Sequence, residues 1–230
     1  MKTLKQTCLT LAVVTVLPLA LVNCAQADDK MVPLELKLPA AAFKGTPKEL
    51  PEGMTVEPLP DEKKGPAPVL VPAGCVNLAA GIVPSSSDTN TATAKLTKIT
   101  DGNKEAYEEQ IVLLRKGVQY VQLDLKKPAN LYAIVVWHAH DAAKVYRSVV
   151  VQIADDAAFT QNVRTLLNND TENKAGQGVG TDKQYFESHW GKRIEAKGQK
   201  AQFVRLWSRG STESALNEYT EVEVWGKPTP

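Results

Sequence analysis

Two histidines stand two positions apart at the end of an apolar run. His138 and His140 follow residues 131–137, and positions i and i+2 of an extended strand face the same side. Such a pair could bind zinc or copper, with Asp141 nearby as a carboxylate ligand. A metal site needs a third and a fourth ligand, and His189 is the only other histidine. Two surface or capping histidines fit the same spacing, so the spacing alone does not distinguish them from a metal site.

Aromatic and cationic residues fall in segments that we expect to be loops: Tyr146, Arg147, Tyr185, Trp190 and Arg209. Proteins bind sugars with an aromatic face and a few fixed polar groups. Trp190 lies between His189 and Gly191 in a polar stretch and is the best candidate for stacking, although a tryptophan that caps the core fits equally. The other tryptophans lie in strand patterns and are assigned to the core or its rim: Trp137, Trp207 and Trp225.

The chain shows few signs of catalysis. It has no nucleophile elbow, no glycine-rich phosphate loop and no zinc-protease helix. The pairs Asp155-Asp156 and Glu108-Glu109 are adjacent in sequence, so on a strand they would point to opposite faces and not form an acid/base pair. Cys75 has no surrounding motif and is expected to be a small buried residue. We therefore expect no catalytic residues.

The first 27 residues have the pattern of a signal peptide. Lys2 and Lys5 precede the apolar run 9–22, and Ala25-Gln26-Ala27 forms a small-x-small cleavage site. This predicts export to the periplasm, the cell surface or the medium. A second interpretation stays open, because residues 21–24 end in Cys24 and resemble a lipobox that would make it a lipid anchor. No other apolar run is long enough to span a membrane.

The charge balance argues against nucleic acid as a partner. The chain has 27 basic and 26 acidic residues, and a nucleic-acid binder needs a clustered basic field. Cleavage after Ala27 removes Lys2 and Lys5 and no acidic residue, so the remaining charge is near −1. It also leaves Cys75 as the only one of three cysteines, so no internal disulfide can form.

Residues 28–72 differ in composition from the rest. Nine of the fourteen prolines lie between Pro33 and Pro72, and this density blocks a continuous helix or a central strand. We predict an extended linker or arm, semi-rigid over residues 58–72. The alternation in residues 34–38 predicts one short edge strand.

From residue 73 onward the pattern is one of strands and turns, typical of a sandwich or barrel. The strands are predicted at 118–125, 131–137, 148–154, 165–167, 202–207 and 219–225. A lysine-rich turn with Pro128 is expected to separate the first two. Residues 155–161 are expected to form one helical turn, and the polar segment 171–182, with three glycines, a long mobile loop.

Five segments of this region, taken in order, resemble the discoidin domain, also called the coagulation factor 5/8 type C domain and related to galactose-binding modules. They are NLAAGIVPSSS (77–87), ITDGNK (99–104), VQYVQLDLKKPANLYAIVVWH (118–138), FVRLWS (203–208) and YTEVEVWG (219–226). The resemblance covers about 150 residues and excludes the arm. It implies an eight-stranded, all-β jelly-roll sandwich at 73–230, with loops at one end that bind glycans, phospholipid head groups or proteins. Many animal members also have a disulfide that Cys75 cannot form here.

The resemblance also implies two sites. Glycan-binding relatives often hold a structural Ca²⁺, which carries over to Asp101, Asn103 and Glu221; a plain Asp101-Gly102 turn is the alternative. Ca²⁺ takes six to eight oxygen ligands, and a glycine turn can aim several carbonyls inward. In the family a histidine at a loop end can hydrogen-bond a sugar hydroxyl. The predicted ligand-contacting residues are therefore His138, His140, Arg147, Trp190 and Arg209.

These observations predict an exported, non-catalytic module that binds carbohydrate or another cell-surface ligand. The alternative is a structural or protein-interaction domain of the cell envelope with no small-molecule ligand. A metal-dependent enzyme that uses His138 and His140 is a more distant third.

Overall fold

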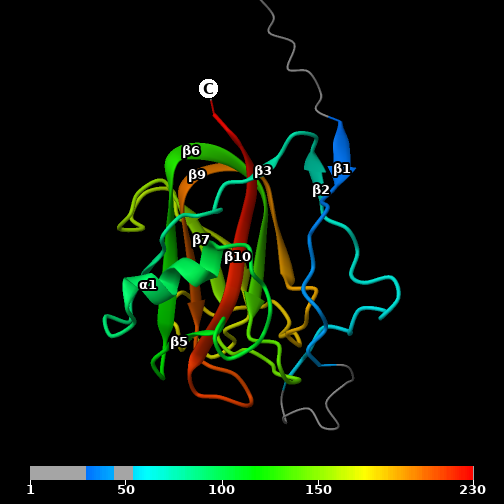
Figure 1. Cartoon of the computed structure of the whole chain (residues 1–230). Coiled ribbons are helices and arrows are strands. Elements are labelled where there is room, and N and C mark those ends of the chain that lie inside the picture. The colour runs from blue at the N-terminus through cyan, green and yellow to red at the C-terminus, as the bar shows by residue number, and fades with distance from the viewer. Residues whose placement is uncertain (1–29, 44–53, 230) are drawn as a thin grey trace, which may run out of the picture.

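The computed structural model describes residues 30–43 and 54–229 of the 230-residue chain (Figure 1). The predicted signal peptide, its cleavage site and Cys24 lie outside the described residues. No helix in the described part of the chain is long and apolar enough to cross a membrane.

Strands make up most of the regular structure, so the all-β prediction is confirmed. The main sheet has eight strands in the order β3-β10-β6-β9-β7-β8, with β4 on β6 and β5 on β10. Their bounds are β3 Val76–Asn77, β4 Ser85–Ser86, β5 Val112–Leu114, β6 Gln119–His138, β7 Val150–Ala154, β8 Arg164–Asn168, β9 Lys192–Ser208 and β10 Asn217–Pro228. One short helix, α1 (Thr93–Leu96), leads into the 3-10 turn η1 (Thr97–Thr100).

Two long strands fold this sheet back on itself to make a sandwich. Residues 119–124 of β6 pair with the end of β9, and residues 129–136 pair with its beginning. The register shifts between these halves at Lys126, which has φ 69°, and again between Leu131 and Ala133, opposite Lys197 of β9, which has φ 52°. Both strands arch over the top of the domain in Figure 1. The lysine-rich segment therefore bends one continuous strand, whereas the sequence predicted a turn between two.

Each half of the long strands belongs to a different layer. The first layer contains β3, β5, β10, the second half of β6 and the first half of β9. The second layer contains β4, the first half of β6, the second half of β9, β7 and β8.

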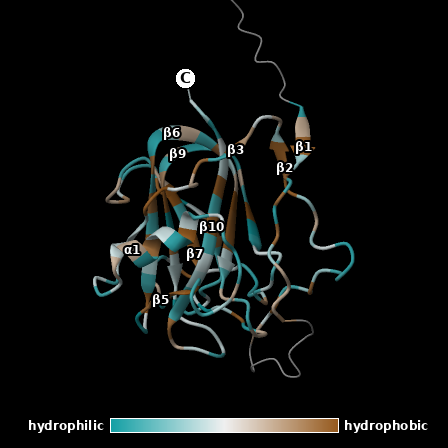
Figure 2. Ribbon diagram, in the orientation of Figure 1, coloured by the Kyte–Doolittle hydropathy of each residue, from teal (hydrophilic) through white to brown (hydrophobic). Residues whose placement is uncertain are grey.

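The core lies between the layers and follows the alternation of the strands. Val121 and Leu123 from one half of β6 and Ile134 and Val136 from the other belong to one buried cluster. In Figure 2 the strands in the middle carry the hydrophobic segments, and the outer loops are mostly hydrophilic. Burial of each such side chain contributes about 1.5–3 kcal/mol.

The arm packs on the outer face of the first layer. Strands β1 (Met31–Pro33) and β2 (Leu70–Pro72) form a two-stranded antiparallel sheet. A second buried cluster joins side chains of the arm to side chains of β6: Leu34, Val69 and Val71 with Ala133, Val135 and Trp137. The second half of β6 is apolar on both faces, and the arm buries its outer face.

The edge strand predicted at 34–38 is not formed. The pairing strand lies just before it, and Leu34 donates its backbone N–H to the Val69 carbonyl at 2.8 Å. The alternation in the sequence serves packing instead, because Leu34 is buried and Leu36 and Leu38 pack against the second cluster.

Two smaller expectations also change. Residues 155–161 form bends and turns and no helix, because the Asp156 carboxylate accepts from the backbone N–H groups of Thr160 and Gln161. The segment 171–182, expected to be mobile, is tied to the domain at Asp170, whose carboxylate accepts from Ser148 Oγ and the Ala175 N–H. Cys75 is half-buried against the second cluster.

Candidate functional site

The two predicted histidine ligands lie inside the domain. His138 and His140 are 0% and 2% exposed. His138 Nδ1 lies 2.9 Å from a Glu187 carboxylate oxygen, and its ring stacks on Tyr146 with centroids 4.2 Å apart. His140 Nε2 lies 2.9 Å from the Lys104 carbonyl. Neither ring reaches the surface, so an external ligand cannot contact them in this conformation.

The histidines also do not converge on a metal. One ring nitrogen of each has its own partner, and the other is buried without one. The Asp141 carboxylate pairs with Lys144 at 2.7 Å. Within residues 30–43 and 54–229, no group of three or more His, Cys, Asp or Glu side chains is placed to hold a metal ion. The pair therefore does not form the zinc or copper site considered from the spacing.

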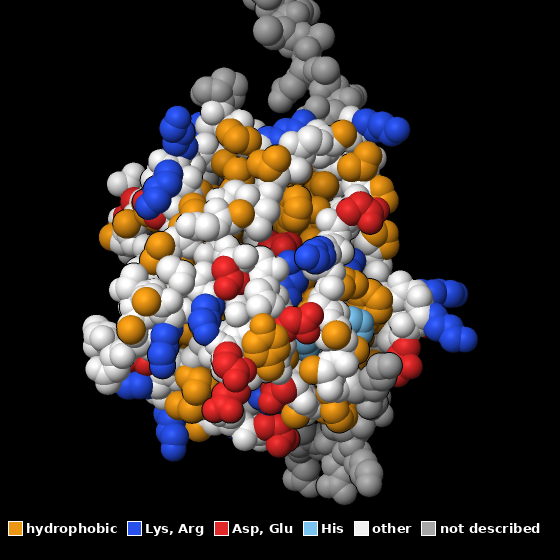
Figure 3. Space-filling model, in the orientation of Figure 1, with side chains coloured by type: hydrophobic (Ala, Val, Ile, Leu, Met, Phe, Trp, Pro, Cys, Tyr) orange, Lys and Arg blue, Asp and Glu red, His pale blue; other side chains and the backbone are white. Residues whose placement is uncertain are grey.

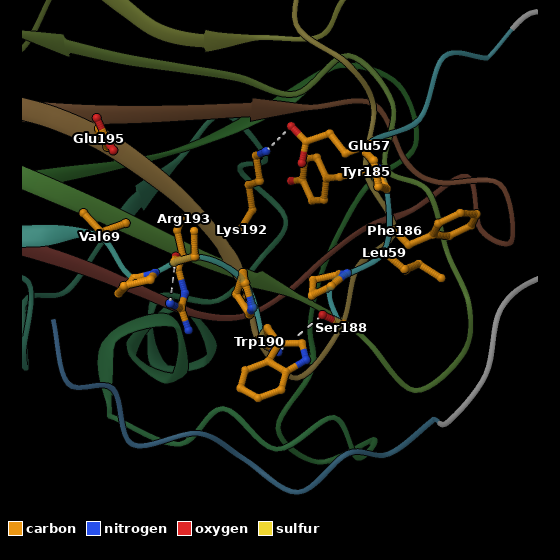
Figure 4. A pocket seen from close by; sticks show the side chains of 16 residues that line it. Glu57, Leu59, Val69, Tyr185, Phe186, Ser188, Trp190, Lys192, Arg193 and Glu195 are labelled. Atoms are coloured by element: carbon orange, nitrogen blue, oxygen red, sulfur yellow. Dashed lines mark hydrogen bonds and ion pairs between the residues drawn. The ribbon is translucent and has the colours of Figure 1, made fainter. Parts of the chain in front are cut away.

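Trp190 lines a pocket between the arm and the start of β9, here called the arm pocket (Figure 4). It has a volume of about 290 Å³, near the lower end for small-molecule sites, which run from about 300 to 1,000 Å³. Its walls include Glu57, Leu59, Val69, Tyr185, Trp190 and Arg193. Four arm prolines complete it: Pro58, Pro60, Pro66 and Pro68.

A tight turn over the second cluster places Trp190. Gly191 has φ 64°, and a Cβ there would lie 2.5 Å from the Trp137 ring, so only glycine fits. The Trp137 indole N–H donates to the His189 carbonyl at 3.0 Å, and this bond holds the turn against β6. The Trp190 ring then meets Gly65 of the arm, where a Cβ would lie 2.8 Å from two ring carbons.

Charged and polar groups line the same pocket. Lys192 Nζ pairs with Glu57 of the arm at 2.5 Å and lies 5.0 Å from the centre of the Tyr185 ring. The Arg193 guanidinium donates to the Ala67 carbonyl at 3.4 Å, and its buried Nε has no partner. The buried Tyr185 hydroxyl also has none, and burial raises the pKa of Tyr185 well above its usual range. The walls of the pocket thus combine aromatic rings with charged side chains.

Arg147 and Arg209 lie together elsewhere, at the loops. The Arg209 backbone N–H donates to the Arg147 carbonyl at 2.9 Å. Both residues line two hollows of about 310 and 250 Å³. The second of these, here called the arginine hollow, is also lined by Ser148, Asn169, Asp170, Thr171, Glu172 and Gln184.

The arginine hollow and the arm pocket share a wall. Gln184 lines the hollow, and the next residue, Tyr185, lines the arm pocket. The arm runs beside this wall, because Val56 bridges Gln184 in parallel and Glu57 donates its N–H to the Gln184 carbonyl at 2.7 Å. The predicted ligand cluster therefore divides into two neighbouring sites, with the histidines in neither.

The residues of the implied calcium site do meet. Gly102 donates its N–H to the Glu221 carboxylate oxygens at 3.1 and 3.2 Å, which places the 101–103 turn against β10. Glu221 is fully buried, and burial raises its pKa to about 9. A buried carboxylate with one weak donor fits a hard cation that takes oxygen ligands.

The other two residues fit less directly. Asp101 Oδ1 accepts from the Asn103 N–H at 2.8 Å, and Asn103 Oδ1 accepts from the Glu105 N–H at 3.1 Å. These are the bonds of a plain turn, the alternative reading of this motif. Lys104 follows and pairs with Glu223 at 2.6 Å. A cation at Glu221 would need Asp101 and Asn103 to exchange turn bonds for metal bonds.

Sequence reasoning missed the part that the arm plays. Residues 57–60 and 66–69 were assigned to a spacer, although they supply half of the residues that line the arm pocket. Lys192 and Arg193 were also missed, because the polar start of β9 was not recognised as a strand. The available signal was the continuous apolar run of β6, since a strand buried on both faces requires a second cover.

On the face seen in Figure 3, basic side chains are scattered, and acidic ones gather low in the view. This face therefore presents no basic field of the kind that nucleic acid requires.

Comparison with known proteins gives only distant likenesses. No family model and no curated protein matches the sequence. Among solved structures, a fucose-binding module of Streptococcus pneumoniae, SpX-3, is 18% identical with a TM-score of 0.45, over 65% of this chain and 96% of that one. Chitosan-binding module 1 of a Paenibacillus chitosanase/glucanase is 17% identical with a TM-score of 0.46, over 66% and 99%.

A third match is to a much longer protein. The family 89 glycoside hydrolase of Clostridium perfringens is 13% identical with a TM-score of 0.44, and the match covers 67% of this chain and 15% of the hydrolase. Likenesses as weak as these do not establish what this chain binds, which has to be argued from its own residues.

Proposed function

We propose that this chain is a non-catalytic module that binds carbohydrate in the arm pocket. One observation carries the proposal: a single hollow is lined by the Trp190 indole together with the charged side chains of Lys192 and Arg193. A sugar presents C–H groups to an aromatic face and hydroxyls to fixed polar groups. The pocket volume suits a small part of a glycan.

The proposed setting is outside the cytoplasm. The signal-peptide pattern of residues 1–27 supports export to the periplasm, the surface or the medium. Lipid attachment at Cys24 is the alternative form of the same proposal. Either form would present the pocket to glycans of a cell surface or its surroundings.

Binding of a glycan panel to residues 28–230, with galactose, fucose, glucosamine and uronate members, tests the proposal. Trp190→Ala should weaken binding of any ligand found by about 30-fold, because loss of an aromatic anchor in a pocket costs on the order of 2 kcal/mol. Trp207→Ala is the matched control, since Trp207 is a half-buried tryptophan in the other layer.

Two results would contradict the proposal. One is equal binding by the Trp190 and Trp207 variants. The other is no binding to any glycan together with specific capture of an envelope protein, which would favour the interaction-domain alternative.

We also propose a structural Ca²⁺ at Glu221, with the carbonyls and side chains of the 101–103 turn. The buried carboxylate supports it, because a cation would take the place of the proton that burial favours. A rise in melting temperature with calcium, reversed by chelator and absent in Glu221→Gln, is the expected result. An identical melt in calcium and in chelator would contradict it.

A further inference from the structure

Arg147 and Arg209 stand apart from the other arginines of the described chain. Arg115 and Arg164 pair with carboxylates, and Arg193 and Arg205 donate to protein oxygens. Within the described residues, the guanidinium groups of Arg147 and Arg209 form neither an ion pair nor a side-chain hydrogen bond with the protein. The Arg209 backbone N–H donates to the Arg147 carbonyl, so the two side chains extend from neighbouring backbone positions.

The arginine hollow contains further polar atoms that are not satisfied. Asn169 is 1% exposed, and its amide orientation is fixed because Oδ1 accepts from the Val149 N–H at 2.7 Å. Its Nδ2 has no partner, and neither has Gln184 Oε1 on the adjoining wall. Both atoms are buried, so a ligand in the hollow does not contact them in this conformation, and the arginines are the groups that it meets.

Three carboxylates border the two hollows, and they do not neutralise the arginines. Asp170 is bonded to Ser148 Oγ and to the Ala175 N–H. Glu172 lies 3.8 Å from Lys174, and Glu213 is exposed. Two open guanidinium groups beside carboxylate acceptors fit a ligand that carries both an anion and hydroxyls.

We infer that the arginine hollow binds the carboxylate of an acidic sugar residue. Guanidinium groups bind carboxylates through two parallel hydrogen bonds. The shared wall at 184–185 places this residue next to the arm pocket, so one oligosaccharide could occupy both sites. The joint occupancy depends on the proposed function, whereas carboxylate binding by the arginines does not.

Titration of residues 28–230 with oligogalacturonate, its methyl-esterified form and a sulfated galactan tests the inference. The esterified form keeps the sugar and removes the charge, and the sulfated polymer changes the anion. We expect the free acid to bind best and the double variant R147A/R209A to lose about 100-fold, near tenfold for each charged hydrogen-bonding arginine. Lysine at both positions should restore little, because it lacks the planar fork.

Arg164→Ala is the control for loss of one positive charge, since Arg164 pairs with exposed Asp155 and lines neither hollow. Its binding should equal that of the wild type. Equal binding of acid and ester, tighter binding of the sulfated polymer, or unchanged binding in R147A/R209A would each overturn the inference. Trp190→Ala separates the two proposals. A variant that no longer binds neutral glycans and still binds the acid through the arginines would show that the arginine hollow acts independently of the arm pocket.

Discussion

Val71 tests whether the arm is part of the folded domain. It lies in β2 of the arm, is 3% exposed, and belongs to the second cluster together with Val135 and Trp137 of β6. Its neighbour Leu70 is 52% exposed in the same short strand. Both positions pair with β1, and they differ in burial.

The magnitude follows from the methyl groups that each change removes. Val71→Ala takes two buried carbons, at about 0.8 kcal/mol each, and leaves a small cavity, so the free energy of unfolding should fall by about 2 kcal/mol. Leu70→Ala removes three carbons from a largely exposed side chain and should change it by less than about 0.5 kcal/mol. The larger deletion is therefore predicted to have the smaller effect.

Urea unfolding of residues 28–230, followed by tryptophan fluorescence, measures both values. Trp137 lies under Val71 and reports on the same packing. A cost for Leu70→Ala equal to or above that for Val71→Ala would refute the docked arm. So would a transition in which Val71→Ala leaves the midpoint unchanged, since a detached spacer contributes nothing to the unfolding of the domain.

Further predictions concern the turn and the buried carboxylate. Gly191→Ala should lower the free energy of unfolding by more than about 2 kcal/mol and weaken glycan binding, because its Cβ would lie 2.5 Å from the Trp137 ring. Gly176→Ala, with φ 70° and open space around it, should lower it by only about 1 kcal/mol through backbone strain. Thermal melts measure both changes. Glu221 has a folded pKa of about 9 against 4.5, so the folded state holds more protons between these values and stability in chelator should fall as pH rises from 5 to 9. Glu221→Gln should flatten this slope, and an unchanged slope would contradict the assignment.

Alternation in the sequence was enough to predict most of the sandwich. The patterns at 148–154, 202–207 and 219–225 fall on β7, β9 and β10, because one face of each strand packs in the core. The bend of β6 was not predictable from the local sequence. Lys126 at positive φ and Pro128 signal a turn, and only the pairing with β9 on both sides keeps the strand continuous.

The sites were predicted only in part, for a physical reason. Trp190 and Arg209 lie in polar stretches, and that context correctly indicated residues outside the core. His138 follows an apolar run, and its spacing from His140 also fits a surface pair, yet Glu187, 49 positions away in sequence, pairs with its ring inside the domain. Partners at such separations are set by the fold and leave no local pattern.

The most direct test of the arm pocket is the set of indole N–H signals in a proton–nitrogen NMR spectrum of residues 28–230. The chain has four tryptophans, and Trp190→Phe identifies the signal of interest. Titration with a bound glycan should shift the Trp190 signal and leave those of Trp207 and Trp225 in place, because these two lie outside the pocket. A saturating glycan that shifts only the other signals would place the binding site elsewhere and contradict the account.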